Sequence, residues 1–583
     1  MRRYSTANLS NRFTDQSFFR ALPLEWIAGF SLALGDMADA LVMGQSMGAT
    51  GLAAVSLALP IFMVINLFMH GLGAGGSVHF SKLLGSGQSD KAKESFSQVL
   101  QGTLVLGVLL ALVGNLFLEP LMLVLGTDPA DGEIYQASST YVRMILTGMP
   151  LFFVSYVLNY YLRNDDNQKL ASFGFAMGNI CDLVLNLVLV LGLRMGVAGA
   201  AWSTIIGQAV ALCLYLPGLF GRRANTLSYK AVVPRVKEVF GCFRVGVSTS
   251  VQYSYQMVFF LMVNNILMRG IGEDGVAVFD VLQNVSFLVM YLYEGAAKAG
   301  QPLISTFCGE RNRAGIQRVG RLVLFCGNIA GIALCLVVSL FPGAVCTLFG
   351  LEGEALTQLA DRALRIYCIG LIFGGTSVLR ESYYQAQEDE RSALFLATMR
   401  GAVILLPCTF LFALVDIRLF WWLFPLTEIL SLAVFLVWRR LCPRRTAEQE
   451  EPVHTRIISG SSEEVSSLTE ALQVFCDEHD AMPTQSYYVM MAVEEVCLAL
   501  TEKVFTKPEE GLIQITAVAC RDGSFELFIR DNAVKFNVFS IASADGKIAN
   551  TALDSLGMSI IKKKVTTFFY RNYQGFNTLY IKI

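Results

Sequence analysis

The chain has 583 residues, of which 54% are hydrophobic and only 16% are charged, and its mean hydropathy is +0.51. A soluble protein would carry about a quarter charged residues, so this composition indicates a membrane protein. The net charge of -2 argues against nucleic acid as a partner. The 13 cysteines show no CxxC or Cys/His spacing, which argues against a disulfide framework or a metal site.

The first apolar stretch, Leu22 to Gly51, is long enough to cross a bilayer, yet it carries Asp36 and Asp39 near its middle. Intramembrane carboxylates normally face a protein interior or a water-filled cavity, because hydrocarbon gives them no partner. The two aspartates are three residues apart and therefore lie on one helix face. Pro23, at the start of the span, can bend or open the first turn. We interpret the pair as functional; the alternative is one carboxylate bonded to a neighbouring helix for packing alone.

Apolar runs separated by short breaks predict about twelve membrane-spanning helices. The expected spans are 22–46, 53–81, 97–125, 140–162, 170–192, 197–219, 240–268, 276–304, 319–348, 360–384, 393–415 and 419–441. Alternate loops, such as GQSDKAK and GERNRAGIQR, hold nearly all the loop lysines and arginines, whereas the others, such as GTDPADGE, are short and mostly acidic. By the positive-inside rule, we expect both termini on the cytoplasmic side of the cell membrane. The polar start of the chain lacks a signal-peptide pattern.

Two pairs of segments about 224 residues apart resemble each other. GLGAGGSVHFSKLLGSGQSDK, from Gly71, and EGAAKAGQPLISTFCGERNRAG, from Glu294, both end a small-residue-rich helix before a basic loop. NYYLRNDDNQKLA (159–171) and ESYYQAQEDERSA (381–393) match at nearly the same offset. The pattern predicts six helices repeated as six, in two lobes related by an axis along the membrane normal. The alternative is that segments of helix, basic loop and helix resemble one another in general.

These motifs resemble the multidrug and toxic compound extrusion (MATE) transporters over roughly residues 20–441. The resemblance rests on Asp39 with the following ALVMGQSMGATGLAAVSLALP, on the basic-loop signature in both halves, on YLRNDDNQKLA and on GNICDLVLN. It implies two six-helix lobes and antiport of organic cations against protons or sodium. It also implies that Asp39 is the ion-coupling carboxylate of the N-terminal lobe and that Pro23 is associated with bending of the first helix. The polar cluster of helix five is matched by Asn179, Asp182 and Asn186.

The spacing within helix five points the same way. Asn179, Asp182 and Asn186 fall at i, i+3 and i+7, so they line one helix face, which could meet Asp36 and Asp39. Carboxylates confined in a poorly solvated site cannot all ionise, so at least one should take a proton at ordinary pH. The same oxygens could instead bind sodium. For each asparagine, hydrogen bonding between helices is an equal alternative.

The second half offers fewer acids. Val263 matches Asp39 at the repeat offset, which puts an equivalent ion site in doubt. Glu294 and Lys298, at i and i+4, are expected to pair, and the isolated His70 and His79 to make local contacts rather than bind a metal. Aromatic and amide groups for an organic cation are offered by Gln252, Tyr253, Tyr255, Gln256, Tyr291 and Tyr293. A tyrosine can equally serve as an anchor at the membrane interface.

After a polar linker, LCPRRTAEQEEPV, the pattern becomes that of a soluble α+β domain of about 130 residues. We expect a strand at RIISG, two helices, a hairpin turning at Asp522 and Gly523, a third helix, and a closing hairpin around Gln574 and Gly575.

This part of the chain resembles the histidine-kinase-like ATPases, closest to anti-sigma-factor serine kinases, at AVEEVCLAL, IRDNAVKF and LGMSIIKKK. The resemblance implies nucleotide-site positions at Glu495, Asp531 and Gly557. Ala499, however, stands where the metal-binding asparagine belongs, and Ala533 replaces the loop glycine. We interpret the site as degenerate, with weak ADP or ATP binding or a purely protein-binding role as the two readings. A chance α+β tail is the alternative.

The sequence thus predicts an all-α polytopic membrane protein with a C-terminal α+β sandwich domain. The expected segments are a cytoplasmic start (1–20), an N-terminal lobe (21–220), a C-terminal lobe (221–441), a linker (442–453) and a cytoplasmic domain (454–583). The expected function is antiport of organic cations against H+ or Na+, with no cofactor, no catalytic or metal-binding residues, membrane lipids around it and a cytoplasmic regulatory protein as a candidate partner. Alternatives are a flippase for lipid-linked saccharides, a membrane-anchored regulator and an active serine kinase.

Overall fold

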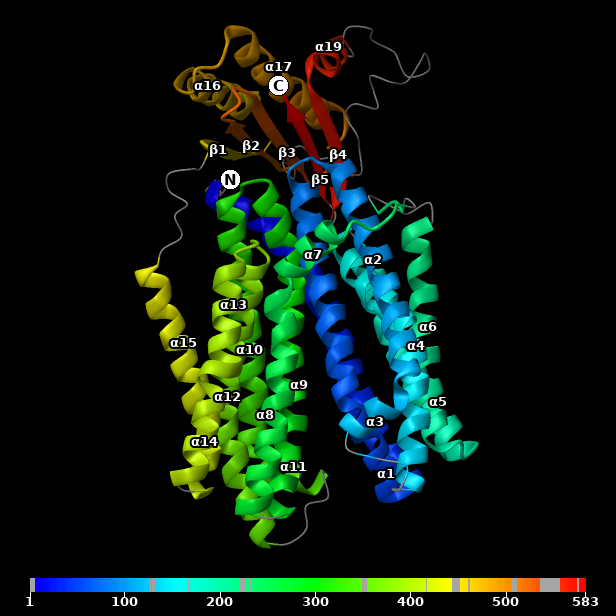
Figure 1. Ribbon diagram of the computed structural model, residues 1–583. Coiled ribbons are helices and arrows are strands. Elements are labelled where there is room, and N and C mark those ends of the chain that lie inside the picture. The colour runs from blue at the N-terminus through cyan, green and yellow to red at the C-terminus, as the bar shows by residue number, and fades with distance from the viewer. Residues whose placement is uncertain are drawn as a thin grey trace.

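The computed structural model describes residues 6–583 except 126, 128, 130, 131, 166, 221–226, 230, 231, 272, 349–353, 416, 443–450, 460, 461, 506–510, 535–555, 574 and 575. Helical bundles make up most of the molecule, and a small sheet covered by helices sits at one end of them (Figure 1). We call this end, where Asn164 and Glu310 contact the C-terminal domain, the domain side. The opposite end is called the far side.

The helices before the C-terminal domain form two bundles. The first bundle comprises α1 (Thr6–Gly85), α2 (Ser89–Leu116), α3 (Leu118–Leu125), α4 (Glu133–Asn164), α5 (Gln168–Asn186), η2 (Leu187–Gly192) and α6 (Gly196–Phe220). The second bundle comprises α7 (Val236–Val245), α8 (Val247–Gly270), α9 (Glu273–Gly309), α10 (Arg313–Leu340), α11 (Pro342–Leu348), α12 (Glu354–Gln385), α13 (Glu390–Thr398), η3 (Met399–Val403), α14 (Leu405–Val415), η4 (Ile417–Trp422) and α15 (Leu423–Leu441).

Within the described residues, nine helical stretches are long and apolar enough to cross a membrane, judged by length and composition alone. They are 57–85, 89–116, 133–164, 168–192, 196–219, 313–340, 356–385, 390–412 and 419–441. The expected spans 22–46, 240–268 and 276–304 are largely helical but are not among the nine, so the count of twelve is not confirmed. The expected span 319–348 is broken before Pro342, because proline cannot continue the helix that precedes it.

Helix α1 contains two passes through the bundle. A straight helix of its 80 residues would be about 120 Å long. Both of its ends nevertheless lie on the domain side, because Asp15 pairs with Arg318 near the start of α10 while Gly85 packs against Gly309, just before α10. Pro23 lies well inside α1 and not in a first turn, so that part of the sequence prediction was wrong. The helix begins 16 residues earlier than expected, at Thr6 instead of Leu22, within the segment predicted to be a polar start.

The two bundles meet through reciprocal contacts. A side chain on Gly85 would collide with the Thr306 carbonyl oxygen, and one on Gly309 would collide with the Lys82 carbonyl oxygen. These are the same contact read from both sides, because Lys82 and Thr306, like Gly85 and Gly309, are separated by 224 positions in the numbering. Reciprocity of this kind is the mark of a twofold relation. It places the axis between the two bundles at these two glycines.

Two further pairs of contacts follow the same relation. Trp26 donates from Nε1 to the Leu292 carbonyl oxygen at 2.9 Å, and its counterpart Ser250 donates at 2.7 Å to the carbonyl oxygen of Leu67, one residue before the counterpart of Leu292. Phe18 packs in the core of the second bundle, whereas its counterpart Cys242 packs in a core of the first. The start of each bundle therefore crosses over to the other one.

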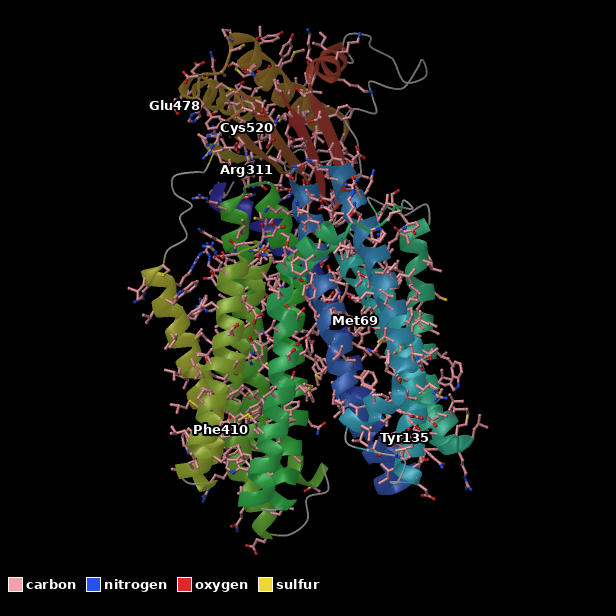
Figure 2. All side chains as sticks on the ribbon, in the orientation of Figure 1. Met69, Tyr135, Arg311, Phe410, Glu478 and Cys520 are labelled. Carbon is pink, nitrogen blue, oxygen red and sulfur yellow. The ribbon has the colours of Figure 1, made fainter. Side chains whose placement is uncertain are left out.

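The bundles approach each other on the domain side and diverge toward the far side (Figure 1). Near the far side, Tyr135 of the first bundle and Phe410 of the second lie well apart, whereas Met69 lies where the bundles still meet (Figure 2). The close approach depends on glycine: a side chain on Gly75 would collide with the Cys242 carbonyl oxygen.

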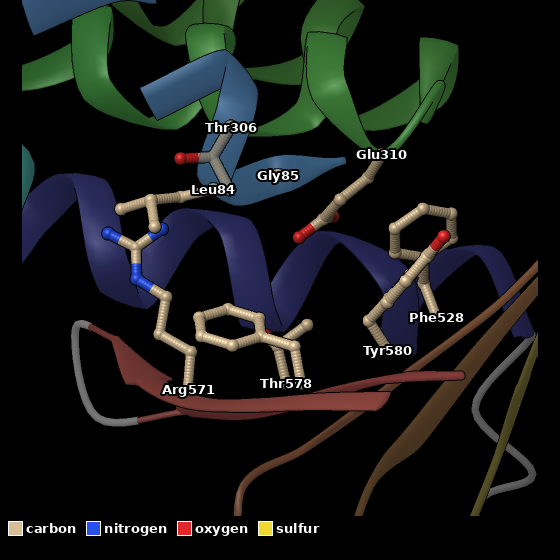
Figure 3. A pocket seen from close by; sticks show the side chains of 9 residues that line it. Leu84, Gly85, Thr306, Glu310, Phe528, Arg571, Thr578 and Tyr580 are labelled. Atoms are coloured by element: carbon tan, nitrogen blue, oxygen red, sulfur yellow. The ribbon is translucent and has the colours of Figure 1, made fainter. Parts of the chain in front are cut away.

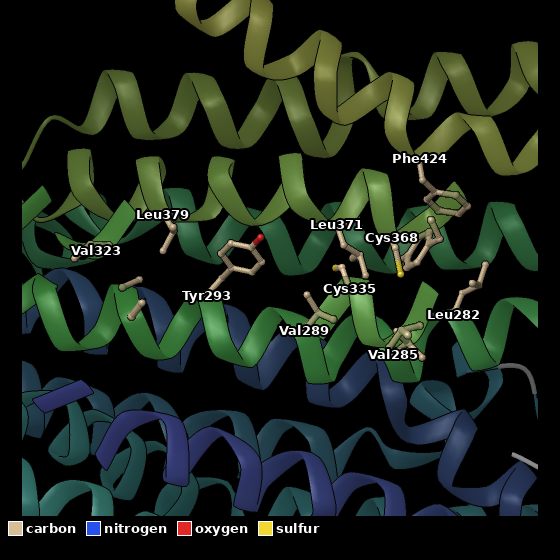
Figure 4. Packing of buried hydrophobic residues seen from close by; sticks show 14 of the residues in the cluster. Leu282, Val285, Val289, Tyr293, Val323, Cys335, Cys368, Leu371, Leu379 and Phe424 are labelled. Carbon is tan, nitrogen blue, oxygen red and sulfur yellow. The ribbon is translucent and has the colours of Figure 1, made fainter. Parts of the chain in front are cut away.

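The core of the second bundle forms around α9, α10 and α12 (Figure 4). Tyr293, a candidate substrate contact by sequence, is fully buried there and fills the space left by Gly331 and Gly375. It is therefore a core residue, and the interpretation of it as a substrate contact was wrong. Val263, the counterpart of Asp39, is also fully buried in this core, as expected of an apolar side chain.

The C-terminal domain is an antiparallel sheet with helices on one face. Its elements are β1 (Val453–Ile458), α16 (Ser462–Glu478), α17 (Pro483–Lys503), β2 (Ile513–Ala519), β3 (Phe525–Asp531), α19 (Leu556–Lys564), β4 (Thr567–Tyr573) and β5 (Phe576–Lys582). The strand order is β1-β2-β3-β5-β4. The turn between β2 and β3 holds Gly523 at φ +78°, where glycine is favoured, as the hairpin prediction required. The other face of the sheet lies against the bundles (Figure 1).

Replacing Gly75 by Val tests the close approach of the bundles. The added side chain would push α1 away from α7, and we expect a loss of stability of about 1–3 kcal/mol, seen as a lower midpoint of thermal unfolding in detergent. Gly241→Val is the matched control, because a Cβ there meets nothing within 4 Å. Equal midpoints for the two variants would contradict the role given to Gly75.

Candidate functional site

The polar face of α5 packs against the first pass of α1. Asn179 is buried and its Nδ2 donates to Ser31 Oγ at 3.4 Å. Two and three turns earlier, Ser172 Oγ and Gln168 Nε2 donate to Glu25 Oε1 at 3.0 and 3.2 Å. Both sets of contacts advance in the same direction along the chain, so this pass of α1 runs parallel to α5.

A buried ion pair holds this arrangement and was missed from the sequence. Glu25 Oε1 lies 3.1 Å from Arg163 Nε of α4, and their side chains are only 1% and 7% exposed. A buried carboxylate needs a partner of opposite charge, and here it also accepts hydrogen bonds from α5. Glu25 therefore fixes α1 against both α4 and α5. The available signal was an acid at the start of the first span and an arginine directly after the end of the fourth.

Asp182 and Asn186 continue the polar face of α5 beyond Asn179. Asp182 is half-buried, and Gly207 of α6 lies so close that a Cβ there would be 2.9 Å from the Asp182 Cβ. Asn186 is buried, with 1% of its surface exposed. The expected one-sided face of Asn179, Asp182 and Asn186 thus lies in the interior of the first bundle. The side chains of Asp36 and Asp39 lie outside the described residues, although α1 is helical through both positions.

A cluster of aromatic rings lies where the two bundles meet. His70 of α1 is stacked on Tyr253 of α8, with ring centroids 5.0 Å apart and planes 15° apart. His70 Nδ1 is also 2.8 Å from the Tyr160 hydroxyl of α4, and the Tyr156 ring lies edge-on at 6.1 Å. His70 thus makes contacts within the protein, as expected. Electron-rich ring faces of this kind attract organic cations.

Charged residues of α9 lie close to this cluster. Glu294 accepts from Lys298 Nζ at 2.8 Å, which confirms the predicted pair. Both interact electrostatically with His70, and Glu294 does so with Tyr253. The cluster therefore contains rings from both bundles and a carboxylate that is already paired.

The other predicted substrate contacts are spread along α8 and α9. Gln252 donates to the buried Glu381, and the Tyr255 hydroxyl lies 3.5 Å from Thr398 Oγ1. Tyr291 packs its Cβ next to Gly29 of α1, and Gln256 is half-buried on α8. Their neighbour Tyr253 joins the aromatic cluster around His70.

The second bundle has its own buried ion pair, also missed from the sequence. Arg400 Nε lies 2.8 Å from both carboxylate oxygens of Glu428, which joins η3 to α15. Glu381 lies close enough to Arg400 to interact with its charge. Arg400 and Glu428 carry no spacing signal, since they are 28 residues apart on different elements.

The C-terminal domain engages Asp531 in its own hydrogen bonds. Asp531 Oδ1 accepts from Asn577 Nδ2 at 2.7 Å and from the Ala533 backbone N–H at 2.9 Å. Burial raises the pKa of this carboxyl to about 6. Ala499 is buried on α17, one turn after the half-buried Glu495. Residues 535–555 lie outside the described part and only the helical backbone of Gly557 is described, so the predicted nucleotide site is described only at its Asp531 and Glu495 sides.

Buried polar contacts between apolar helices, and an aromatic cluster between two bundles related by a repeat, are features of membrane transporters. The sequence model of the MatE family matches residues 27–190 and 245–411, more than half of the chain. The chain therefore belongs to the MatE family, whose members are transporters and not enzymes. The matched segments begin at 27 and 245, 218 residues apart, close to the repeat offset.

Curated relatives agree with this membership. The chain is 26% identical over 411 residues to the multidrug export protein MepA of Staphylococcus saprophyticus, covering 69% of this chain and 88% of that protein. It is 24% identical to the probable multidrug resistance protein YoeA of Bacillus subtilis, covering 60% and 76%.

Solved structures show the same fold. A multidrug resistance MATE transporter in an outward-facing conformation superposes with a TM-score of 0.68 at 22% identity, covering 73% of this chain and 95% of that one. A MATE structure in a bent conformation gives 0.67. Among the described residues, no group of three histidine, cysteine or acidic side chains could hold a metal ion.

Replacing Arg163 by Met tests the buried pair of the first bundle. The substitution leaves the Glu25 carboxylate buried without its charge partner, so we expect a loss of about 3–5 kcal/mol of stability, measured as a lower unfolding midpoint in detergent. Adding Glu25→Gln should recover part of the loss. Arg365→Met is the control, because Arg365 is 57% exposed in its pair with Asp361. A loss no larger than that of Arg365→Met would refute the structural role of Arg163.

Protonation of Asp531 should make the C-terminal domain sensitive to pH. Its native pKa of about 6 lies above the ordinary value of 3.8. The stabilisation from its proton is therefore complete below about pH 4 and lost as pH rises through about 6, by about 2–3 kcal/mol in all. Hydrogen exchange of β3 and β5 amides in the full chain, corrected for intrinsic rates, measures this change. Asp531→Asn should flatten the dependence, and an unchanged pH profile in that variant would contradict the assignment.

Proposed function

We propose that this chain is a secondary antiporter that exports small organic cations across the cell membrane in exchange for H+ or Na+. The observation that carries the proposal is the polar face of α5 packed inside the first bundle against α1. Family membership supports it, as do the names of the relatives MepA and YoeA, which refer to multidrug export and multidrug resistance.

The coupling ion binds where α1 and α5 continue beyond their described contacts. Ser172 contacts Glu25, and Asn179 contacts Ser31, so six residues of α1 correspond to seven of α5. Extending this parallel register brings the α1 backbone near 34–37 beside Asp182 and Asn186. Asp36 belongs to that stretch and Asp39 follows two residues beyond it, so several carboxylates share one poorly solvated region. Such groups share protons or bind a sodium ion, because they cannot all stay ionised alone.

The substrate binds between the bundles, at the aromatic cluster around His70. The rings of Tyr253, Tyr156 and Tyr160 come from both bundles, so the affinity for a bound cation depends on how the two bundles are placed relative to each other. Neutralisation of the carboxylates by the coupling ion shifts the two bundles, and the substrate is released on the other side of the membrane. Residues 21–220 and 221–441 are the two moving lobes in this proposal.

The domain side is the cytoplasmic side in this proposal. It carries the basic loops GQSDKAK and GERNRAGIQR, and both the N-terminal end of α1 and the C-terminal domain lie there (Figure 1). The bundles meet on this side and diverge toward the far side, which corresponds to a state open to the outside.

The C-terminal domain, residues 454–583, has a regulatory role in this proposal. The sheet with helices on one face and the buried Asp531 agree with a degenerate nucleotide-binding fold. Ala499 cannot ligate magnesium through a side-chain oxygen, so the proposal includes weak ADP or ATP binding at most and no hydrolysis. A cytoplasmic protein is the other candidate ligand of this domain.

Gradient-driven transport in proteoliposomes tests the antiporter. We would impose a proton gradient and a sodium gradient separately and follow a fluorescent organic cation. We expect one gradient to drive its movement, and Asp39→Asn or Asp182→Asn to reduce that movement to the level of empty liposomes, because a neutral amide no longer exchanges the ion. The gradient that succeeds identifies the ion.

Asp361→Asn serves as the control, since Asp361 lies at the surface of α12 and pairs with Arg365 within one helix turn. It should transport like the unaltered protein. Normal gradient-driven transport by Asp39→Asn would rule out the proposed coupling site, and no movement with either ion would rule out the antiporter.

A further inference from the structure

The C-terminal sheet presents one face to the bundles and the other to its own helices. Side chains alternate along a strand. On β3, Leu527 and Ile529 therefore point into the core of the domain, whereas Phe528 and Arg530 point toward the bundles. Tyr580 on the neighbouring β5 packs with Phe528 on the same face.

On the second bundle, this face makes a buried ion pair. Arg530 Nη2 lies 2.5 and 2.7 Å from the two carboxylate oxygens of Glu310, in the turn between α9 and α10. The two side chains are 10% and 5% exposed. The Arg530 guanidinium also lies 4.7 Å from the centroid of the Phe307 ring. Next to Glu310, Arg311 Nη1 lies 3.8 Å from Cys520 Sγ (Figure 2).

On the first bundle, the same face makes a second set of contacts. Arg571 of β4 donates from Nη2 to the Asn164 carbonyl oxygen at 2.6 Å, where α4 ends. The Tyr580 ring lies against Gly87, whose φ of +73° favours glycine and where any side chain would collide with the ring. Phe569 packs against the core that contains Leu84.

The two sets of contacts lie on either side of the axis between the bundles. A small pocket between them is lined by Gly85 and Thr306, which touch across the axis, and by Glu310, Arg571 and Tyr580 (Figure 3). The C-terminal domain therefore sits over the point about which the bundles are related.

Close to this axis, a charged contact between the bundles lies around Glu388, separate from the pair of Asp15 and Arg318. Glu388 of the second bundle lies 3.1 Å from His79 Nδ1 and 2.5 Å from Lys82 Nζ of the first. At the 224-residue offset, the counterparts of Glu388, His79 and Lys82 are Asn164, Leu303 and Thr306, and none of these three side chains carries a charge. A symmetric ion pair is thus impossible there. Arg571 contacts Asn164 at this place, and Arg530 contacts the nearby Glu310.

We infer that the C-terminal domain is a clamp that holds the domain-side ends of the two bundles together through Arg530 and Arg571. The domain-side ends cannot separate until the sheet releases one bundle. The inference rests on the proposed rocking of the bundles and adds the structure that controls it. A ligand that binds the domain and loosens this face would activate transport, whereas one that fixes the face would block it.

Distances between the bundles in the full-length protein test the clamp. Asp90 of α2 and Ala314 of α10 are exposed counterparts on the domain side. Spin labels would be attached to noncanonical residues there, because the chain has 13 cysteines, and the distance distribution measured in liposomes without gradient or substrate. We expect a single short distance in the otherwise unaltered chain. Arg530→Glu, which places two carboxylates together, and the milder Glu310→Gln should both add a longer-distance population.

The charge exchange Arg530→Glu with Glu310→Arg should restore the short distance, which separates loss of the pair from misfolding of the domain. Lys563→Glu is the matched control: it makes the same charge change on exposed α19, away from the bundles. An unchanged distribution in Arg530→Glu and Glu310→Gln, or a longer population that the exchange does not remove, would overturn the inference. Because no ion gradient is used, an error in the coupling ion leaves this result intact.

Discussion

A charge inside a bilayer needs a partner, and the arrangement of this protein depends on how its few buried charges are paired. Glu25 joins the first pass of α1 to Arg163 of α4 and to α5. Arg400 and Glu428 join η3 to α15 in the same way. Apolar contacts alone would let these helices slide, because lipid is as apolar as their side chains. The polar pairs therefore determine which face of each helix points inward, and hence where Asn179 and Asp182 lie.

The twofold relation between the bundles is exact in some contacts and broken in others. Gly85 and Gly309 make equivalent contacts with each other at the axis, and a side chain on either one would collide with the opposite helix. At some positions that carry a charged side chain in one bundle, the other bundle has a different residue. The position of Asp39 is taken by Val263, which is buried in apolar core, so only the first bundle retains the carboxylate. Glu388 has charged partners, whereas its counterpart Asn164 contacts the C-terminal domain instead. The fold thus provides two similar halves, and substitutions within it give each half a separate task.

The elements of the fold could be read from the sequence because they depend on local patterns. The length of the apolar runs predicted most of the helices. Alternating apolar and polar residues, bounded by turn residues, predicted the five strands and the hairpin at Gly523. The repeat was visible because the glycines near the axis cannot vary without collision. The errors have local causes as well. The polar segment before Leu22 was assigned to a cytoplasmic start outside the first span, although it continues α1 as a helix on the domain side, where water and the second bundle replace lipid.

The contacts that matter for the site could not be predicted in the same way, because they join residues far apart in the chain. His70 and Tyr253 stack across 183 positions of the sequence, and Glu310 and Arg530 pair across 220. Neither residue of such a pair carries a signal until the helices are placed. Arg530 illustrates the point: on a strand next to Asp531, it reads as a surface residue of a soluble domain. Its burial exists only because another domain supplies the carboxylate, so a sequence-based interpretation of either domain alone necessarily misses it.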